Sequence, residues 1–253
     1  MAPMYVISVN VGRARTAAAP GDAPGFAAGL DTGIDKRPAR GPVAVAPPGP
    51  KGIAGSGLAG DEVVNRRHHG GDHQAVYAFA REDLDGWERE LGRALPHGSF
   101  GENLTTCGID VNGALIGERW RIGADLVLEV SAPRIPCRTF ADWLGEAGWM
   151  KRFTQEAAPG AYLRVVESGE VRAGDPVTIV HRPDHEVSIS FLFRALTTER
   201  ALLPRVLAAG DALHPESVEA VHKHLARQRN QPEGSVGAPQ GPRGTAASTN
   251  VPV

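Results

Sequence analysis

Glycine and proline interrupt this chain so often that they leave room for few long helices. The 253 residues include 31 Gly and 20 Pro, and both residues favour turns. Between these breaks lie short runs of alternating, β-branched apolar residues, such as residues 4–11. Alternation with a period of two is typical of a half-buried strand. The sequence therefore predicts a mixed α/β, β-rich body.

The first 183 residues carry most of the strand signals and form one predicted domain, residues 1–183. Helical spacing appears at residues 81–91, where Leu84, Trp87 and Leu91 share one face. Two further short helices are predicted at 139–145 and 149–157. The predicted strands are residues 4–11, 42–46, 114–122, 125–130, 161–166 and 177–180.

The character of the chain changes after residue 183, because strand signals stop. Three short helical faces follow: Phe191, Leu192 and Ala195; then Ala201, Leu202 and Val206 before Gly210; then Val218, Val221, His222 and Leu225 after Pro215. These predict a three-helix domain over residues 184–230. Residues 231–253 are rich in Gly, Pro, Ser and Thr, which predicts a disordered tail.

The net charge, the lack of long apolar segments and the number of cysteines argue against several classes of protein. A net charge of −2 gives no general attraction to nucleic acid or anionic lipid. No segment approaches the ~20 apolar residues of a membrane span, and no signal peptide is recognisable, so a cytoplasmic protein is expected. The two cysteines, Cys107 and Cys137, are too few to hold an iron–sulfur cluster by four thiolates.

Cys137 lies in the segment richest in chemistry, residues 131–140, which read SAPRIPCRTF. Prolines restrict the backbone on its N-terminal side. Arg134 and Arg138 flank it and would lower the thiol pKa. A thiolate is both a nucleophile and a ligand for soft metals. Local composition fits a reactive or metal-binding cysteine and a buried, inert one equally well.

A second polar segment, residues 68–77, reads HHGGDHQAVY. Its glycines allow close approach of a ligand to the backbone. The spacing of His68, His69 and His73 does not suit zinc, and no thiol or carboxylate completes such a site. Histidines that position a ligand or support the structure are expected instead. A Cys137–His69 dyad remains open, whereas no nucleophile elbow or P-loop motif is present.

A set of motifs in a fixed order resembles the MOSC proteins. These motifs are TGIDKRP (32–38), GDE (60–62), HGG (69–71), QAVY (74–77), GENL (101–104), IGERWRIG (116–123), PRIPC (133–137) and AYLRVVESGEVRAGDPV (161–177). The resemblance covers about residues 4–230. It is strongest to the stand-alone bacterial branch linked to resistance to N-hydroxylated purines such as 6-N-hydroxylaminopurine, which carries a C-terminal three-α-helix domain.

This resemblance implies a MOSC β-barrel body with peripheral helices and a bound molybdenum cofactor (molybdopterin), with Cys137 supplying the thiolate to the metal. A thiolate suits molybdenum as a ligand, and arginine and backbone N–H groups suit the cofactor's phosphate. Further cofactor-binding residues are expected to be Arg134, His69, Gly70, Asn103 and Lys36, with Arg37 and Arg13 as weaker candidates.

The activity implied is reduction of small N-hydroxylated substrates to amines, with His69 or His73 as proton donor. No flavin or nicotinamide motif is present, so a separate reductase, a flavin or iron–sulfur protein, is the expected electron donor. The three-helix domain is a candidate docking surface for it. Two alternatives stay open: a sulfur-transfer protein carrying a persulfide on Cys137, and a non-catalytic molybdopterin carrier.

Overall fold

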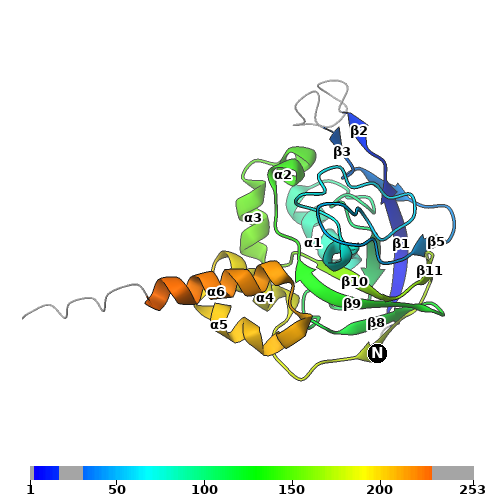
Figure 1. Ribbon diagram of the computed structural model, residues 1–253. Coiled ribbons are helices and arrows are strands. Elements are labelled where there is room, and N and C mark those ends of the chain that lie inside the picture. Colours follow the sequence, from blue (N-terminus) through cyan, green and yellow to red (C-terminus); the bar gives the residue numbers. More distant parts are fainter. Residues whose placement is uncertain (1–2, 17–30, 230–253) are drawn as a thin grey trace, which may run out of the picture.

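A curved β-sheet body with helices along one side makes up the described part of the chain, residues 3–16 and 31–229 of a computed structural model (Figure 1). Eight strands form one sheet in the order β12-β8-β9-β10-β6-β7-β1-β4, and β11-β5 and β2-β3 form small separate pairs. The strands are β1 (Tyr5–Gly12), β2 (Arg15–Thr16), β3 (Asp31–Thr32), β4 (Lys36–Pro38), β5 (Val43–Val45), β6 (Val76–Ala80), β7 (Leu104–Cys107), β8 (Arg119–Ile122), β9 (Leu126–Pro133), β10 (Ala161–Glu167), β11 (Gly169–Val171) and β12 (Val177–His181).

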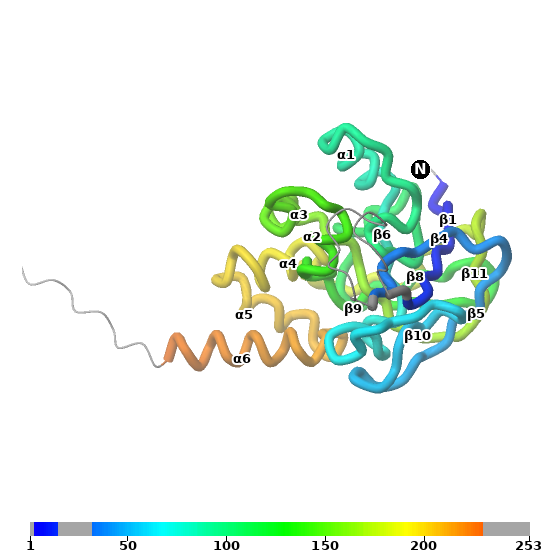
Figure 2. Tube along the Cα trace, turned by 90° about the horizontal axis from the view of Figure 1, so that it is seen from above, coloured from blue at the N-terminus to red at the C-terminus, as the bar shows by residue number. Residues whose placement is uncertain are grey.

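Helices gather on one side of the strands, and α6 projects away from them in both views (Figures 1 and 2). In the described ranges, none of them is long and apolar enough to cross a membrane. They are α1 (Arg81–Leu91), α2 (Arg138–Leu144), α3 (Trp149–Glu156), α4 (Ile189–Thr197), α5 (Leu203–Val206) and α6 (Pro215–Arg229), with short 3₁₀ helices η1 (Asp72–Gln74), η2 (Arg200–Leu202) and η3 (Leu207–Ala212).

Strand β9 lies between β8 and β10 and pairs with both in antiparallel fashion. All eight of its residues are buried. Its one carboxylate, Glu129, is neutralised by Arg119, whose Nε lies 2.7 Å from it, and by Arg164. The strand ends at Pro133, which lacks an N–H group for the ladder. The cysteine-containing segment therefore leaves the sheet from a rigid, buried strand.

The predicted closed barrel is not confirmed. Within the described residues, β12 and β4 stand at opposite ends of the hydrogen-bonded order. Curvature does bring the starts of β1 and β12 together, because Val6 N donates to Asp175 O at 2.9 Å and Val177 N donates to Met4 O at 2.9 Å. This pairing is confined to the strand starts, so the structure supports a mixed α/β, sheet-rich fold.

Helices α1, α2 and α3 enclose a second, aromatic core. Phe100 stands at its centre, with its ring centroid 5.1 Å from Phe140 and 5.5 Å from Trp149. Trp87 of α1 contacts Trp149 of α3 at 4.6 Å. Such edge-to-face pairs add to the free energy gained from burial. The cluster anchors α2, the helix that begins directly after Cys137.

Several predicted elements are confirmed, and two interior strands were missed. The helix predicted at 81–91 is α1, and those predicted at 139–145 and 149–157 are α2 and α3. The sequence did not predict β6 or β7, which pair in parallel at the middle of the sheet. All five residues of β6 are buried, so its sequence VYAFA lacks the alternation that identifies a strand with one solvated face.

The C-terminal helices agree with the prediction only in part. Phe191, Leu192 and Ala195 of α4 are buried, as expected. Ala201 was expected to face inward but is exposed, because the middle helix is one α-turn between two 3₁₀ segments. His222 of α6 is also exposed, although it was expected to face inward with Val221.

Most buried apolar side chains of these helices belong to the same cluster as the sheet, and Phe193 belongs to the aromatic core. Whether residues 184–230 form a domain of their own stays a prediction. The tail predicted at 231–253 lies outside the described residues.

Candidate functional site

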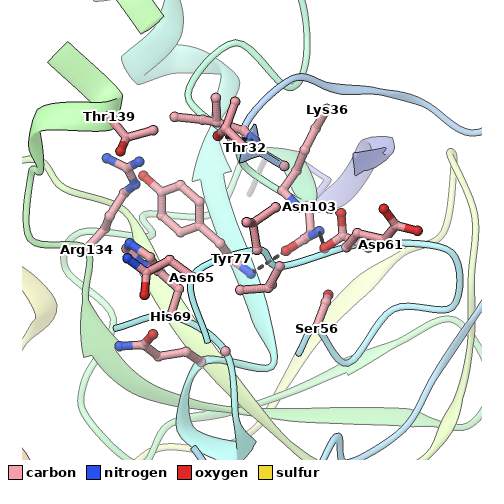
Figure 3. A pocket seen from close by; sticks show the side chains of 18 of the residues that line it. Thr32, Lys36, Ser56, Asp61, Asn65, His69, Tyr77, Asn103, Arg134 and Thr139 are labelled. Atoms are coloured by element: carbon pink, nitrogen blue, oxygen red, sulfur yellow. Dashed lines mark hydrogen bonds and ion pairs between the residues drawn. The ribbon is translucent and has the colours of Figure 1, made fainter. Parts of the chain in front are cut away.

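A cavity of about 140 Å³ lies where loops from distant parts of the chain converge (Figure 3). Its walls come from the segment before β4, the loops at 56–65 and 69–74, the start of β6, the turn before β7, the segment after β9 and one residue of β10. Six of the site residues chosen from the sequence line it: Lys36, His69, Gly70, Asn103, Arg134 and Cys137.

Three other candidates from the sequence do not line the cavity: the weaker cofactor contacts Arg13 and Arg37, and the alternative proton donor His73. Arg13 and Arg37 are exposed, and Arg37 donates from Nε to Asp35 Oδ1 at 2.6 Å. His73 faces elsewhere, since its Nδ1 lies 3.1 Å from Ser131 Oγ and its ring contacts His214. The structure therefore gives His73 no access to a molecule bound in the cavity.

Arg134 is a buried cation of the site, with 5% of its surface exposed. Its Cζ atom lies 3.8 Å from the ring centroid of Phe140 and 5.5 Å from that of Tyr77. In the part of the chain that the structure describes, no carboxylate pairs with it, and its Nη1 atom has no hydrogen-bond partner. Figure 3 shows the guanidinium between Tyr77 and Thr139. A buried donor without a partner is costly, so this geometry suits a bound anion.

Cys137 directly precedes α2, and its thiol lines the cavity while staying partly exposed. Its backbone is extended, and its carbonyl oxygen accepts from Ala141 N at 3.1 Å, which starts the helix. Arg138 points outward: 90% of its side chain is exposed, and its Nε lies 3.6 Å from an Asp142 carboxylate oxygen. Of the two arginines that flank Cys137 in sequence, only Arg134 shares the cavity with the thiol.

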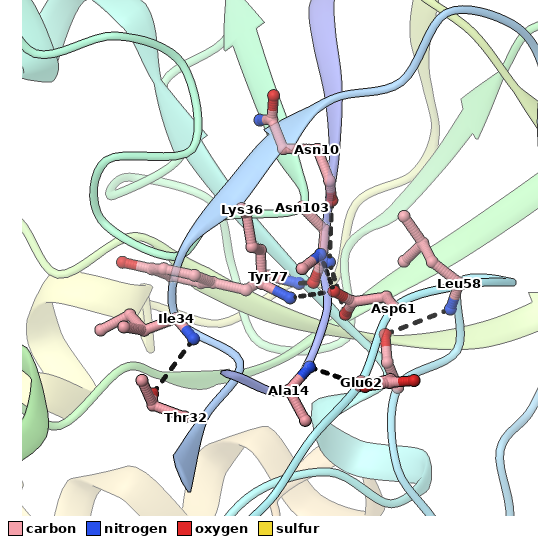
Figure 4. A network of polar contacts seen from close by, with 12 residues as sticks. Asn10, Ala14, Thr32, Ile34, Lys36, Leu58, Asp61, Glu62, Tyr77 and Asn103 are labelled. Atoms are coloured by element: carbon pink, nitrogen blue, oxygen red, sulfur yellow. Dashed lines mark hydrogen bonds and ion pairs between the residues drawn. The ribbon is translucent and has the colours of Figure 1, made fainter. Parts of the chain in front are cut away.

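Asp61 organises the polar end of the cavity (Figure 4). Its Oδ1 accepts from Gly12 N at 2.8 Å and pairs with the Lys36 ammonium. Its Oδ2 accepts from Asn103 Nδ2 at 2.9 Å, while Asn103 Oδ1 accepts from Tyr77 N at 3.1 Å. Burial lowers the pKa of Lys36, and the Asp61 carboxylate opposes that shift. Lys36 and Asn103 are thus held in place by a carboxylate that sequence reasoning did not single out.

His69 is a neutral imidazole at pH 7. Burial lowers its pKa to about 4, and the positive charges of Arg134, His68 and Lys51 add to that effect. A depressed pKa means that the protonated form is scarce near neutral pH. An anion bound beside Arg134 would offset part of this positive charge.

The loop that carries His69 is fixed by a glycine contact. Gly70 has a φ of +82°, and a Cβ atom there would lie 2.6 Å from Gly55 O. The next residue, Gly71, donates its N–H to Gly55 O at 3.0 Å. Only glycine combines this backbone conformation with so close an approach. The cavity wall is therefore packed directly on the 54–55 turn.

Comparison with known proteins places this chain. A sequence model of the MOSC domain matches residues 65–178. The uncharacterized protein YflK of Bacillus subtilis is 33% identical over 189 residues, which cover 75% of this chain and 79% of YflK. The chain belongs to the MOSC domain family.

Two further proteins resemble this MOSC chain. The crystal structure of YiiM from Geobacillus stearothermophilus superposes with a TM-score of 0.68 at 27% identity, covering 88% of this chain and 100% of that one. A protein of Gibberella moniliformis named "Reductase" is 28% identical over 158 residues. That match covers 61% of this chain but only 28% of the fungal protein. The fold is thus YiiM-like and mixed α/β.

Sequence reasoning missed several residues of the MOSC cavity. Asp61 stands in the GDE motif and Tyr77 in QAVY, so both were visible as family motifs without a role. Tyr162 lines the cavity from β10, and it too stood in a family motif, residues 161–177, without a role. Lys36 and Asp61 precede the region that matches the domain model. The polar end of the cavity is therefore completed from outside that region.

Proposed function

We propose that this protein is a molybdenum-cofactor-binding oxidoreductase that reduces N-hydroxylated compounds to amines, with Cys137 as the protein ligand to the metal. The observation that carries the proposal is the pairing of two groups in one cavity: a thiol, and a buried arginine whose Nη1 has no partner among the described residues. These are the groups that a metal with a phosphate-bearing organic ligand requires.

The residues present fit such a cofactor. Arg134 offers a buried donor to a phosphate oxygen, and Cys137 offers sulfur to the metal. When bound, the cofactor supplies two-electron redox chemistry. The protein supplies the walls: Asp61 holds Lys36 and Asn103 rigidly. Fixed polar groups of this kind orient a ligand with little loss of conformational entropy on binding.

Reduction of a hydroxylamine to an amine consumes two electrons and two protons and releases water. We assign one proton transfer to His69. Burial is the main cause of the low His69 pKa, and a cofactor phosphate beside Arg134 would offset the smaller contribution of the positive charge there. In this assignment a proton from solvent passes through the His69 ring to the leaving hydroxyl.

The electrons come from a second protein in this proposal, a flavin or iron–sulfur reductase. The chain has two cysteines, Cys107 and Cys137, too few to hold an iron–sulfur cluster by four thiolates. The Cys107 thiol donates a hydrogen bond to Glu82 Oε1 at 3.2 Å. The fungal relative named "Reductase" supports reductive chemistry, and the 158 matched residues correspond to 28% of that protein's length. A cytoplasmic location is part of the same proposal.

Metal analysis is the first test. The wild type and Cys137→Ala would be purified from a host that makes molybdenum cofactor, and molybdenum and pterin would be measured. We expect near-stoichiometric metal in the wild type and its loss in the variant. Absence of both from well-folded wild type would refute the proposal and favour sulfur transfer, with a persulfide on Cys137. Bound cofactor without reductase activity from an artificial donor would favour a carrier.

A further inference from the structure

A basic rim borders the mouth of the cavity. We define it as Arg66, Arg67 and His68, which are exposed and follow residues 63–65, three residues that line the cavity. The loop returns into the wall at His69. A molecule bound to this rim would therefore contact the loop that forms part of the cavity wall.

His68 lies near enough to the Glu216 carboxylate for their charges to interact, but the charge of the two arginines is not neutralised in this way. Within residues 3–16 and 31–229, neither Arg66 nor Arg67 pairs with a carboxylate, and Arg66 Nη1 donates to the carbonyl oxygen of Ile53 at 3.1 Å. The sequence has no acidic residue between Glu62 and Asp72. Both of those carboxylates accept backbone N–H groups, at 2.6 Å for Glu62 and 2.8 Å for Asp72. A local basic surface thus stands out on a chain whose net charge is −2.

Exposed apolar side chains accompany this charge. Ile53 is 73% exposed and lies beside Arg66, which donates a hydrogen bond to its carbonyl oxygen. Val64 is 39% exposed and lines the cavity. Ile135 is 46% exposed and lies in the short segment between two cavity residues, Arg134 and Cys137. Large apolar residues together with arginine are typical of protein–protein interfaces.

We propose that the basic rim is the docking surface for an acidic electron-donating protein. The inference rests on the proposed function, which requires electrons from a second protein. Opposite charges on the two partners would steer the encounter. Because Val64 belongs both to the cavity wall and to the exposed surface, a protein docked here brings its redox group toward the cavity.

A nucleic acid is the other anionic macromolecule that a basic surface attracts. Binding to it depends on neutralising many phosphates with lysine and arginine. The rim offers two arginines and one histidine among exposed apolar side chains. That composition favours an acidic protein.

The test is a binding titration with an oxidised acidic flavodoxin as probe, at 20 and 300 mM NaCl. The rim variant is Arg66→Glu/Arg67→Glu. The matched control is Arg227→Glu/Arg229→Glu, which makes the same charge change at exposed positions in the last turn of α6. We expect the wild type and control to bind alike and to weaken with salt. The rim variant should bind at least about tenfold more weakly at low salt.

Equal affinities for all three proteins would overturn the proposal, as would failure of the wild type to bind. The rim variant would also be titrated with a 20-nucleotide single-stranded DNA. If it loses affinity for the DNA but keeps its affinity for flavodoxin, the rim binds nucleic acid and the docking proposal is wrong. Circular dichroism would verify that the variants are folded.

A turnover experiment separates this inference from the proposed function. Holoprotein would reduce an N-hydroxylated substrate with either reduced methyl viologen or reduced flavodoxin as donor. We expect the rim variant to keep the viologen-driven rate and to lose at least about tenfold of the flavodoxin-driven rate. No viologen-driven turnover by the wild type would refute the proposed function. Viologen-driven turnover with equal flavodoxin-driven rates in wild type and variant would refute only the docking surface.

Discussion

The guanidinium carbon of Arg134 lies 3.8 Å from the ring centroid of Phe140. Phe140 is fully buried in the aromatic core of α1, α2 and α3. The stacking holds a cation at the cavity that no carboxylate in the described ranges neutralises. The cationic charge is therefore positioned by packing, which leaves donor capacity for a ligand.

Replacing Arg134 should lower cofactor binding without lowering the stability of the protein. In Arg134→Met we expect the unliganded protein to be as stable as the wild type or more so, because a buried charge without a counterion is removed. We expect molybdopterin content to fall at least about tenfold, as charge-assisted hydrogen bonds are lost. Pterin analysis and urea unfolding measure the two effects. Arg138→Met, at an exposed site, is the control. Wild-type pterin content in Arg134→Met would contradict the assignment.

Removing Asp61 should destabilise the protein through Lys36. In Asp61→Asn the Lys36 ammonium stays buried without its counterion, which costs about 3 kcal/mol of unfolding free energy. Urea denaturation measures the loss. The double variant Lys36→Met/Asp61→Asn should recover part of it.

The exposed pair of Glu219 with Lys223 provides the comparison for Asp61. In Glu219→Gln we expect a change below about 1 kcal/mol. A loss of the same size in Glu219→Gln and Asp61→Asn would contradict the role given to the buried pair.

Because of His214, the free energy of unfolding should decrease as the pH falls below 6.5. It is 6% exposed, and its Nδ1 accepts from Glu216 N at 3.1 Å. Burial, and to a smaller extent the nearby His73, lower its pKa to about 4, from 6.5 when unfolded. Because the folded pKa is depressed, the neutral form stabilises the fold above pH 6.5, and this stability is lost as pH falls from 6.5 toward 4.

That loss corresponds to roughly 3 kcal/mol between pH 7 and pH 4. Urea unfolding at a series of pH values should therefore give a steeper decline for the wild type than for His214→Gln. Parallel curves for the two proteins would show that His214 does not titrate in this window.

Gly70 should resist substitution more strongly than another glycine with positive φ. In Gly92→Ala, where no heavy atom lies within 4 Å of the new Cβ, only backbone strain of about 1 kcal/mol is expected. In Gly70→Ala the Cβ also meets Gly55 O, which adds about 1–3 kcal/mol. Thermal unfolding compares the two variants. We also expect reduced molybdenum content in Gly70→Ala alone, because His69 would shift. Equal losses of stability would contradict this packing argument.

Local patterns in the sequence predicted several elements of the fold and the cysteine of the candidate site. The spacing of Leu84, Trp87 and Leu91 predicted α1 with its observed bounds. Local composition singled out Cys137, and the resemblance carried by PRIPC, HGG and GENL implied further residues that line the same cavity. These features are readable because helical period, turn residues and ordered motifs are local properties of the chain.

Tertiary structure alone decided which side chains meet. Arg134 and Arg138 flank the same cysteine, yet one is buried in the cavity and the other is exposed. Lys36, Asp61 and Asn103 are distant in sequence but form one buried network. Whether the sheet closes into a barrel likewise depends on pairing between strands that are far apart in the sequence. Burial and pairing partners follow from how strands and loops far apart in sequence pack together, and no local period encodes that arrangement.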